Sequence, residues 1–495
     1  MAETIEDAFM EDIIADPDDD TPRLIYADWL DDHGQEARAE FIRVQIERAR
    51  LGDDDERSDG LRRRERELLA EHGNGWLGDS REGCLHGAIL ELDYAFWRGF
   101  LDKVLLSPNT LVDHAPALYR LGPLSFITFE SDKKGFERLG KSEYAGRLHG
   151  IELVISKTWS EVAPLLLSEH LTSLQNLWLG VPLDSNALTR FLAAPVVKSL
   201  RDLAVELTAT GVEQVANCAA LSQLRSLLLA GEIGPLGAQF LAGARHLGKL
   251  EELWLTSCHI TPPGVRALAG TTRLSALSEL NLGGNPLGNE GVDAIAKSTT
   301  FPRLTRLGLG HIDLGRSGLS GLASSPILMN LRALDLSGNQ LGNAAMAILA
   351  RGKVPPALMV LDVGDNAIED EGAKALASWL GLAGLRTLRL HGNRLSAFGL
   401  KAILSSSHLG PVTELYLENN LLRDLGAQVL ARWPGLARLR HLDVTCNDIG
   451  DEGALALLRS EHFGRPKELH IDEDALGEST TRLIEEMTKQ GRILG

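Results

Sequence analysis

Leucines recur at a fixed spacing along the second half of the chain, from Leu277 to Arg465. Each unit of 27 residues has the pattern L-x-x-L-x-L-x-x-N-x-L, as in residues 331–341. Successive units begin at Leu250, Leu277, Leu304, Leu331, Leu358, Leu385, Val412 and Leu439. Because the register holds over many copies without a gap, the pattern predicts a solenoid in which each unit stacks on its neighbours.

The first half of each unit predicts a short strand that ends in a turn. Alternate residues of a strand face opposite sides, so Leu334 and Leu336 are expected to point inward and Asp335 outward. The side chain at the asparagine position can hydrogen-bond backbone groups of the turn. This structural asparagine/cysteine ladder comprises Cys258, Asn285, Asn339, Asn366, Asn393, Asn420 and Asn447.

Two residues depart from asparagine in this column. Cysteine is a permitted substitute in such repeats, so we interpret Cys258 as structural rather than as a reactive thiol. Ile312 has no group that can make the hydrogen bonds of asparagine. We therefore predict a local irregularity at residues 310–314, and a gain in stability on Ile312→Asn.

The second half of each unit predicts a helix. One column is small, at Gly264, Gly291, Gly318, Ala345, Gly372, Gly399, Gly426 and Gly453, and a leucine or isoleucine follows each member four residues later. The apolar column is expected to bury against the sheet, and the small column to lie close against the preceding turn. Strands pack about 4.8 Å apart and helices about 8–10 Å apart, so stacking both layers forces curvature.

These features predict an α/β fold, a leucine-rich-repeat solenoid curved into a horseshoe with parallel strands on the concave face and helices on the convex face. The strand-plus-helix unit resembles the ribonuclease-inhibitor-like subfamily, whose members mainly bind other proteins. Regular repeats are expected over 250–476, irregular repeats over 83–249, and a C-terminal capping helix over 477–495. Terminal repeats are expected to be atypical because one face meets solvent or a cap.

Residues 1–51 predict a small all-helical domain. An apolar stripe at residues 8–14 has helical spacing, Thr21-Pro22 is typical of a helix start, and a third helix is expected over residues 39–51. The segment AFMEDIIADPDDDTPRLIYADWLDDHGQEARAEFIRVQIERARL resembles the repeat-companion domain at the N-terminus of certain bacterial leucine-rich-repeat proteins. That resemblance implies a cytoplasmic repeat protein, and the domain has no established biochemical activity. The domain is interpreted either as a cap or as a module that recruits a separate partner.

Residues 52–82 are expected to contain a charged linker, 52–60, followed by a helix rich in arginine. Glutamates interleave with these arginines, which favours a solvated face over an RNA-binding helix. The aspartates near residues 16–20 do not form a calcium-binding EF-hand loop, because Thr21 and Ala27 stand where glycine and glutamate are required. We expect no metal and no cofactor.

Charge is concentrated at the N-terminal end. The net charge is −18, of which residues 1–50 carry −10 and residues 51–100 carry −5. This balance argues against a nucleic-acid partner. The start lacks the features of a signal peptide, no apolar run reaches the roughly 20 residues of a membrane helix, and four scattered cysteines suit a reducing compartment. We predict a cytoplasmic monomer with no membrane partner.

The outward positions of the strands are the candidate binding surface, because the leucines are committed to the core. The candidate partner-binding residues on this concave face are Trp178, Leu228, Glu252, Trp254, Glu279, Arg306, Asp335, Asp362, Arg389, Tyr416, His441 and Asp443. Exposed aromatic and arginine side chains are the usual anchors of protein interfaces. Neighbouring carboxylates repel one another, and a partner with a basic patch would relieve that repulsion.

Enzymatic interpretations have little support in the sequence. Phosphate-binding glycine loops, H-E-x-x-H and nucleophile elbows are absent from it. His441 and Asp443 share a strand face with no evident nucleophile, and Asp335 with Asp362 would make a carboxylate-based hydrolase only in a pocket that excludes water. A GTPase-activating regulator is the main alternative. We predict a non-enzymatic scaffold that acts as an adaptor, regulator or inhibitor.

Overall fold

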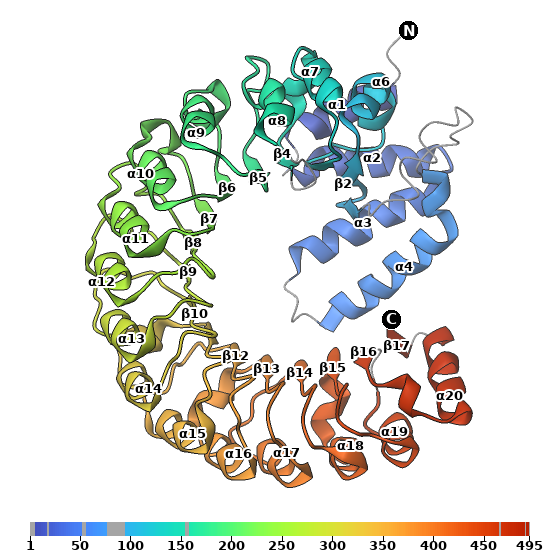
Figure 1. Cartoon of the computed structure of the whole chain (residues 1–495). Coiled ribbons are helices and arrows are strands. Elements are labelled where there is room, and N and C mark those ends of the chain that lie inside the picture. Colours follow the sequence, from blue (N-terminus) through green and yellow to red (C-terminus); the bar gives the residue numbers. More distant parts are fainter. Residues whose placement is uncertain are drawn as a thin grey trace. The chain divides into compact units, whose positions relative to one another are not determined.

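The computed structural model describes residues 5–16, 19–51, 56–76, 95–153, 158–464, 467–490 and 492–494. The chain forms two compact units (Figure 1). Unit 1 contains Met1–Glu206 with Cys218–Leu224, and unit 2 contains Leu207–Asn217 with Arg225–Gly495.

Unit 1 begins with four helices, α1 (Ile5–Ala15), α2 (Asp20–Asp32), α3 (Glu36–Arg50) and α4 (Glu56–Trp76). The first three bury Met10, Ile13, Leu30 and Ile42 in one core with Phe100. Helix α2 begins earlier than predicted, since its N-cap is Asp19, whose carboxylate accepts from the Thr21 N–H at 2.9 Å. Helix α4 also begins earlier, at Glu56 instead of residue 61, so part of the expected charged linker is helical.

Buried polar contacts attach these helices to the first strands, β1 (Ala95–Trp97) and β2 (Phe100–Leu106). Gln45 on α3 donates from Nε2 to Glu65 of α4 at 2.6 Å, and its Oε1 accepts from the Gly99 N–H at 2.6 Å. Gly99 has a φ of 92°, and a Cβ there would lie 2.5 Å from a side-chain carbon of Ile42. The helices therefore pack directly against the hairpin that opens the repeats.

The remaining strands of unit 1 continue from β2 as a parallel ladder, whereas β1 pairs with β2 in the antiparallel sense. The strands are β3 (Phe126–Phe129), β4 (Gly150–Glu152), β5 (Asn176–Leu179) and β6 (Asp202–Glu206). The helices are α6 (Pro108–Tyr119), α7 (Lys133–Leu139), α8 (Trp159–Leu166) and α9 (Ser185–Leu192), with short 3₁₀ segments at Glu143–Arg147, Pro195–Lys198 and Ala219–Leu221.

Unit 2 repeats a strand and a helix along its whole length. Its strands are β7 (Ser226–Ala230), β8 (Glu252–Trp254), β9 (Glu279–Asn281), β10 (Arg306–Gly308), β11 (Ala333–Asp335), β12 (Val360–Asp362), β13 (Thr387–Arg389), β14 (Glu414–Tyr416), β15 (His441–Asp443), β16 (Lys467–His470) and β17 (Ile493–Leu494). From β8 to β16 each residue pairs with the one 27 positions later, in parallel.

The helices of unit 2 lie on the outer side of its curved strand layer (Figure 1). They are α10 (Ala209–Asn217), α11 (Gly234–Gly243), α12 (Pro262–Gly270), α13 (Gly288–Ala296), α14 (Arg316–Ala323), α15 (Gly342–Arg351), α16 (Asp370–Ala377), α17 (Ala397–Leu404), α18 (Arg423–Ala431), α19 (Asp451–Leu458) and α20 (Glu478–Lys489). Short 3₁₀ segments lie at Ile327–Asn330, Leu380–Gly384, Pro434–Arg438 and Glu473–Ala475. The predicted fold class, a leucine-rich-repeat solenoid of α/β type preceded by helices, is confirmed.

The asparagine column of unit 2 forms a ladder of hydrogen bonds between repeats. The Asn366 side chain is fully buried, and its Oδ1 accepts from the N–H groups of Asn339 and Leu341 at 3.1 and 3.2 Å. Its Nδ2 donates to the carbonyl oxygens of Leu336 and Gly364 at 2.9 and 2.8 Å. Each asparagine thus satisfies backbone groups of its own turn and of the preceding one.

The prediction of a local irregularity at residues 310–314 is wrong. His311 and Asp313, which flank Ile312, have φ values of 54° and 59°, as Asp365 and Ala367 have 52° around Asn366. The turn keeps this shape because the following repeat supplies the acceptor: Asn339 Oδ1 accepts from the Ile312 N–H at 3.1 Å.

A second ladder, which the sequence analysis did not predict, caps the helices. Asp370 lies in the first turn of α16, and its Oδ1 accepts from the N–H groups of Ser396 and Gly399 at the start of α17, at 2.9 and 3.0 Å. The same pair of bonds starts α14 from Asn289, α16 from Asn343 and α19 from Asp424. A helix start has unpaired N–H groups, and here the preceding repeat satisfies two of them.

These caps explain four of the eight members of the small column, Gly318, Gly372, Gly399 and Gly453. A Cβ added at Gly399 would lie 2.4 Å from Asp370 Oδ1, so the capping carboxylate occupies the space that a side chain would need. The other four members are Gly264, Gly291, Ala345 and Gly426. The residues in the capping position before them are Pro235, Pro262, Arg316 and Ala397, whose side chains offer no acceptor. At Gly291 and Gly426 the space is instead taken by a leucine four residues earlier, Leu287 and Leu422.

No helix among the described residues is both long and apolar enough to cross a bilayer. The predicted C-terminal helix is present as α20, which ends at Lys489 and is followed by β17. Thr480 of α20 is fully buried, and its hydroxyl donates to Asp451 of α19.

Candidate functional site: the outward strand face of unit 2

The candidate binding residues lie on β5 and on β7–β15, and all except Trp178 belong to unit 2. Trp178 stands on β5 of unit 1, is 47% exposed and packs edge-on against Phe126 at 5.7 Å between ring centroids. In unit 2 the side chains of Leu228, Glu252 and Arg306 are exposed, those of Trp254, Glu279, Asp335, Arg389, Tyr416, His441 and Asp443 are partly buried, and that of Asp362 is buried. We name these outward residues of β7–β16 the strand face.

Part of the acidic pattern on the strand face has a local structural cause. Asp335 Oδ1 accepts from the Ser337 N–H at 2.8 Å, and Asp362 Oδ1 from the Gly364 N–H at 2.9 Å. The neutral Asn281 makes the same bond to Gly283 at 2.9 Å. A side chain that turns back to an N–H two residues later stabilises the end of the strand. One oxygen of each aspartate therefore has a structural role, which the neutral asparagine fills equally well. The negative charge of the aspartates is not needed for that role.

The most enclosed carboxylate on the strand face is that of Asp362, which is 8% exposed. Burial raises its pKa, and the neighbouring Asp335 carboxylate raises it further. The nearest cations stand at the edge of ion-pair range: Arg389 Nη1 lies 3.8 Å from Oδ2, and His391 Nδ1 lies 4.0 Å from Oδ1. These two cations therefore offset only part of the free energy that the Asp362 carboxylate loses when it is removed from water.

His391 lies at the centre of this acidic region and was missed by the sequence analysis. Its Nε2 is 3.6 Å from Asp365 Oδ2, and its Nδ1 is 3.9 Å from Glu418 Oε1. Burial also raises the pKa of Glu418. The ring fits because Gly364 has no side chain, and a Cβ there would lie 2.2 Å from it. His391 lies two residues after Arg389, at the outward position just beyond the strand. The sequence signal for it was Gly364, the glycine 27 residues earlier, which leaves room for the ring.

An arginine and aromatic rings continue the strand face next to Asp362. The Arg389 guanidinium lies over the Tyr416 ring, 4.9 Å from its centroid, and the Tyr416 ring stacks on His441 at 4.3 Å. These contacts fix the orientation of three side chains that would otherwise be mobile on an open surface. A rigid arginine and tyrosine are favourable anchors for a protein partner.

A shallow hollow of about 150 Å³ lies over β9–β13. Its charged lining consists of Glu279, Arg306, Asp335, Asp362 and Arg389. Arg306 Nη1 is 3.7 Å from Glu279, and burial raises the pKa of that glutamate. The hollow is open and small, so it suits the end of one side chain rather than a whole small-molecule ligand.

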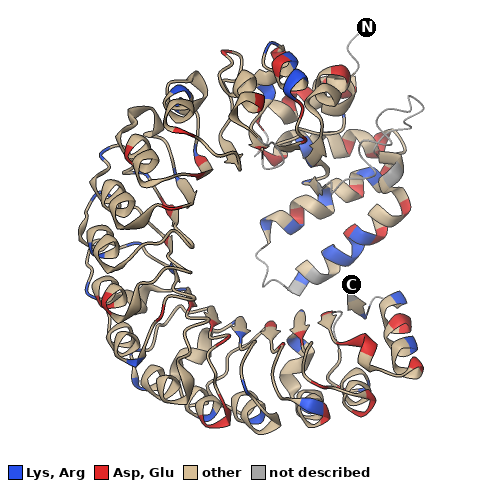
Figure 2. Cartoon of the chain, in the orientation of Figure 1, with Lys and Arg blue, Asp and Glu red and all other residues tan. Residues whose placement is uncertain are grey.

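Acidic groups outnumber arginines on the strand face when the turn position after each strand is included. The acidic residues are Glu252, Glu279, Asp335, Asp362, Glu414, Glu418, Asp443, Glu468 and Asp472, and the arginines are Arg306 and Arg389. On the helices of unit 2, by contrast, both signs of charge are interspersed (Figure 2). The strand face is therefore the more acidic of the two surfaces.

Cys258 occupies its ladder position as a buried thiol. The Sγ–H is placed to donate to the Leu229 carbonyl at 3.2 Å, and burial raises the pKa of the thiol to about 12. A thiol with so high a pKa is a poor nucleophile at neutral pH. Three cysteines, Cys218, Cys258 and Cys446, are free; Cys84 lies outside the described residues.

Comparison with known proteins identifies the repeat. A family model described as "Leucine Rich repeat" matches residues 247–269, 275–296, 328–350, 356–377 and 438–458. A search of curated proteins finds no match.

Two solved structures are similar in fold at low identity. An internalin (inlF) from Listeria monocytogenes is 18% identical, with 74% of this chain and 93% of that chain covered and a TM-score of 0.35. A chain of the Rad7 and Elc1 complex from yeast is 12% identical, with 97% and 96% covered and a TM-score of 0.44. The matched segments and the parallel 27-residue register together establish that unit 2 is built from leucine-rich repeats.

Proposed function

We propose that this chain is a non-enzymatic protein-binding scaffold whose strand face receives lysine or arginine side chains of a partner. The observation that carries the proposal is the state of Asp362. Its carboxylate is almost fully buried beside Asp335, and its nearest cationic nitrogen is 3.8 Å away. A cation from a partner would compensate this charge more fully than Arg389 does.

The surroundings of Asp362 suit such a partner. A basic side chain that enters the hollow meets Asp335 and Asp362, while the rest of the partner packs against Arg389 and Tyr416 at its edge. Charge complementarity of this kind mainly sets specificity and the association rate, and aromatic and arginine anchors contribute most of the affinity. Trp254 and Leu228 extend the same face with apolar area toward β7.

The carboxylates of the hollow are better suited to binding than to catalysis. Asp335 and Asp362 each commit one oxygen to a backbone N–H, which fixes their orientation. The hollow is open to solvent, whereas carboxylate-based hydrolysis needs a pocket that encloses the substrate. In this proposal the chain acts as a monomeric adaptor, regulator or inhibitor. The repeat-companion resemblance supports a bacterial, cytoplasmic setting, and the ribonuclease-inhibitor-like resemblance supports protein binding.

The helices α1–α4 serve, in the same proposal, as the N-terminal cap of the repeats rather than as a recruitment module. The support is the polar bridge from Gln45 to Gly99 and the shared core with Phe100. Deletion of residues 1–51 should lower the unfolding midpoint of the chain strongly and leave partner capture by unit 2 intact in the fraction that folds. A deletion that leaves stability unchanged and abolishes capture would establish recruitment instead.

The test of the binding face is a paired charge removal. The double variant Asp335→Asn/Asp362→Asn keeps both turn hydrogen bonds, because Asn281 makes the same bond, and removes two negative charges. The matched control, Glu371→Gln/Glu452→Gln, removes two charges from α16 and α19. Affinity purification with quantitative mass spectrometry should show partners that the wild type and the control retain and the strand-face variant loses. Identical partners in identical amounts from all three proteins would contradict the proposal.

A further inference from the structure

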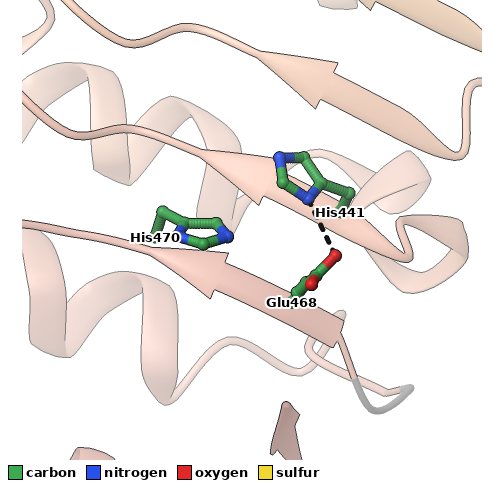
Figure 3. A group of neighbouring side chains, drawn as sticks. All are labelled: His441, Glu468 and His470. Carbon is green, nitrogen blue, oxygen red and sulfur yellow. Dashed lines mark hydrogen bonds and ion pairs between the residues drawn. The ribbon is translucent and has the colours of Figure 1, made fainter. Parts of the chain in front are cut away.

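Three potential metal ligands lie together on β15 and β16 of unit 2 (Figure 3). His441 begins β15, and Glu468 and His470 stand on β16. The parallel register pairs His441 with Glu468 and Asp443 with His470. Because outward residues of neighbouring strands lie side by side, an imidazole, a carboxylate and a second imidazole converge on one point of the surface.

The spacing of these groups is close to that of a coordination shell. His441 Nδ1 lies 3.1 Å from Glu468 Oε2, and one ligand atom of each of the three residues lies within 4.8 Å of the others. A tetrahedral ion with bonds of about 2.0–2.1 Å separates its ligands by about 3.3 Å. One edge of the shell is therefore already formed, and small side-chain rotations of the exposed Glu468 and His470 close the other two.

The His441 ring is the anchor of the cluster. It stacks on Tyr416 with 4.3 Å between centroids and lies 5.1 Å from the His470 ring. Its side chain is 14% exposed, against 52% for Glu468. The buried Nε2 of His441 has no hydrogen-bond partner in the described part of the chain, so the polar contacts of the ring are concentrated at Nδ1. The pre-oriented ring reduces the entropy that an ion must overcome to assemble the site.

The donor set selects one class of ion. Imidazole nitrogens suit borderline transition ions such as Zn²⁺, whereas Mg²⁺ and Ca²⁺ require shells dominated by oxygen. Two histidines and one carboxylate are a frequent three-ligand set for zinc and leave a fourth position open. Since Glu468 and His470 are exposed, that position faces solvent and is available to water or to another donor.

We propose that His441, Glu468 and His470 form a binding site for a divalent transition-metal ion of the Zn²⁺ class. This site is separate from the acidic hollow at Asp362 and does not depend on the proposed protein binding. The sequence concealed it because the three residues are isolated along the chain: 27 positions separate His441 from Glu468, and the histidine on β16 is not spaced for a recognised metal motif.

The test titrates ZnCl₂ into the full chain and measures stoichiometry and affinity by calorimetry. The variants are His441→Gln, His470→Gln and Glu468→Gln, the last of which retains a hydrogen-bonding partner for His441. His408→Gln, in the turn after α17 and outside the cluster, is the matched control for loss of one of the 14 histidines. Circular dichroism and the melting temperature establish that each variant is folded.

The expected result is one saturable Zn²⁺ per chain in the wild type and in His408→Gln that Mg²⁺ does not displace. Each variant in the cluster should weaken this affinity by at least about tenfold, as losses around metal sites commonly do. Zn²⁺ should also raise the melting temperature of the wild type and not that of His441→Gln. Absence of saturable binding in the wild type, or equal affinity in the double variant His441→Gln/His470→Gln, would overturn the site.

Discussion

The helices of unit 1 and those of unit 2 obtain their N-terminal caps from different places. In unit 1 the helices α6, α7 and α9 are capped by the residue directly before them, Ser107, Asp132 and Asp184 respectively. In unit 2 the helices α14, α16, α17 and α19 receive a side-chain oxygen from the preceding repeat. The caps of these unit 1 helices are local, whereas the four helices of unit 2 are capped from the preceding repeat, with a local cap from Ser396 in addition at α17.

The asparagine position shows the same contrast. Asn109 of unit 1 stands three residues after the inward Leu106, as Asn366 of unit 2 stands three residues after the inward Val363. The Asn109 side chain lies in α6 and bonds to the side chains of Asp132 and Arg138. The Asn366 side chain bonds to four backbone groups of two turns. Regular repetition therefore allows a polar side chain to hydrogen-bond the backbone of the adjacent repeat, because that backbone has the same position relative to it in every copy.

The largest expected effect tests this difference directly. Asn366→Ala removes four hydrogen bonds and leaves buried backbone groups of two turns unpaired, which should cost about 3–4 kcal/mol at about 1 kcal/mol for each bond. Asn109→Ala should cost less than about 1 kcal/mol, because its partners are side chains that water can solvate. Urea unfolding followed by circular dichroism measures both. Equal losses would remove the distinction between the two units.

Helix capping can be tested by identifying which helix exchanges its amide hydrogens faster after a capping residue is removed. Asp370→Ala should cost about 1–2 kcal/mol and Asp184→Ala a similar amount, as for other N-cap losses. The two should differ in location: Asp370→Ala should increase amide exchange in α17, the helix of the next repeat, whereas Asp184→Ala should increase it in α9 alone. Hydrogen exchange with mass spectrometry resolves the two. Exchange confined to α16 in the Asp370 variant would refute capping between repeats.

The buried carboxylate of Asp362 should change the unfolding free energy by a smaller amount than the side chains above, and it should lower that free energy rather than raise it. Burial raises the folded-state pKa of Asp362 above its unfolded value, so the folded state binds more protons in the window between the two. The unfolding free energy therefore falls as the pH rises through that window. Asp362→Asn should be more stable than the wild type at neutral pH, and the difference should shrink as the pH is lowered through the raised pKa. A wild type that is the more stable at neutral pH would contradict this charge assignment.

The smallest expected effect is at Ile312, which interrupts the asparagine/cysteine ladder. Ile312 is fully buried in the asparagine column, and Ile312→Asn should add bonds to neighbouring backbone groups and stabilise the chain by up to about 1 kcal/mol. The gain is small because the apolar burial of the isoleucine is lost. A fall in melting temperature on this substitution would show that packing outweighs hydrogen bonding at this position.

The period of 27 residues was sufficient to predict the alternation of strand and helix, the inward leucines and the parallel register. These follow from the sequence because each depends on the identity of a residue and its distance from the same residue in the next copy. The buried state of Leu334 and the outward position of Asp335 need no further information. Errors arose where a neighbour decides the outcome, as at Ile312, whose turn is held by Asn339.

The candidate site was less predictable than the fold. Sequence alone identified the outward positions, among them Asp335, Asp362 and Tyr416. It did not show that one oxygen of each aspartate is bound to the backbone, or that Asp362 is the buried member of the pair. Those properties depend on side-chain direction and on what covers each group, and neither is encoded in spacing.

The sequence by itself therefore determined a stack of strand-and-helix units and the column that each residue occupies. Only the tertiary structure decided which residues of different columns meet: Asp370 with the start of α17, His391 with three carboxylates, and His441 with Glu468 and His470. The physical reason is distance along the chain. These contacts join residues up to 29 positions apart through space, and they form only after the hydrophobic columns have set one repeat against the next.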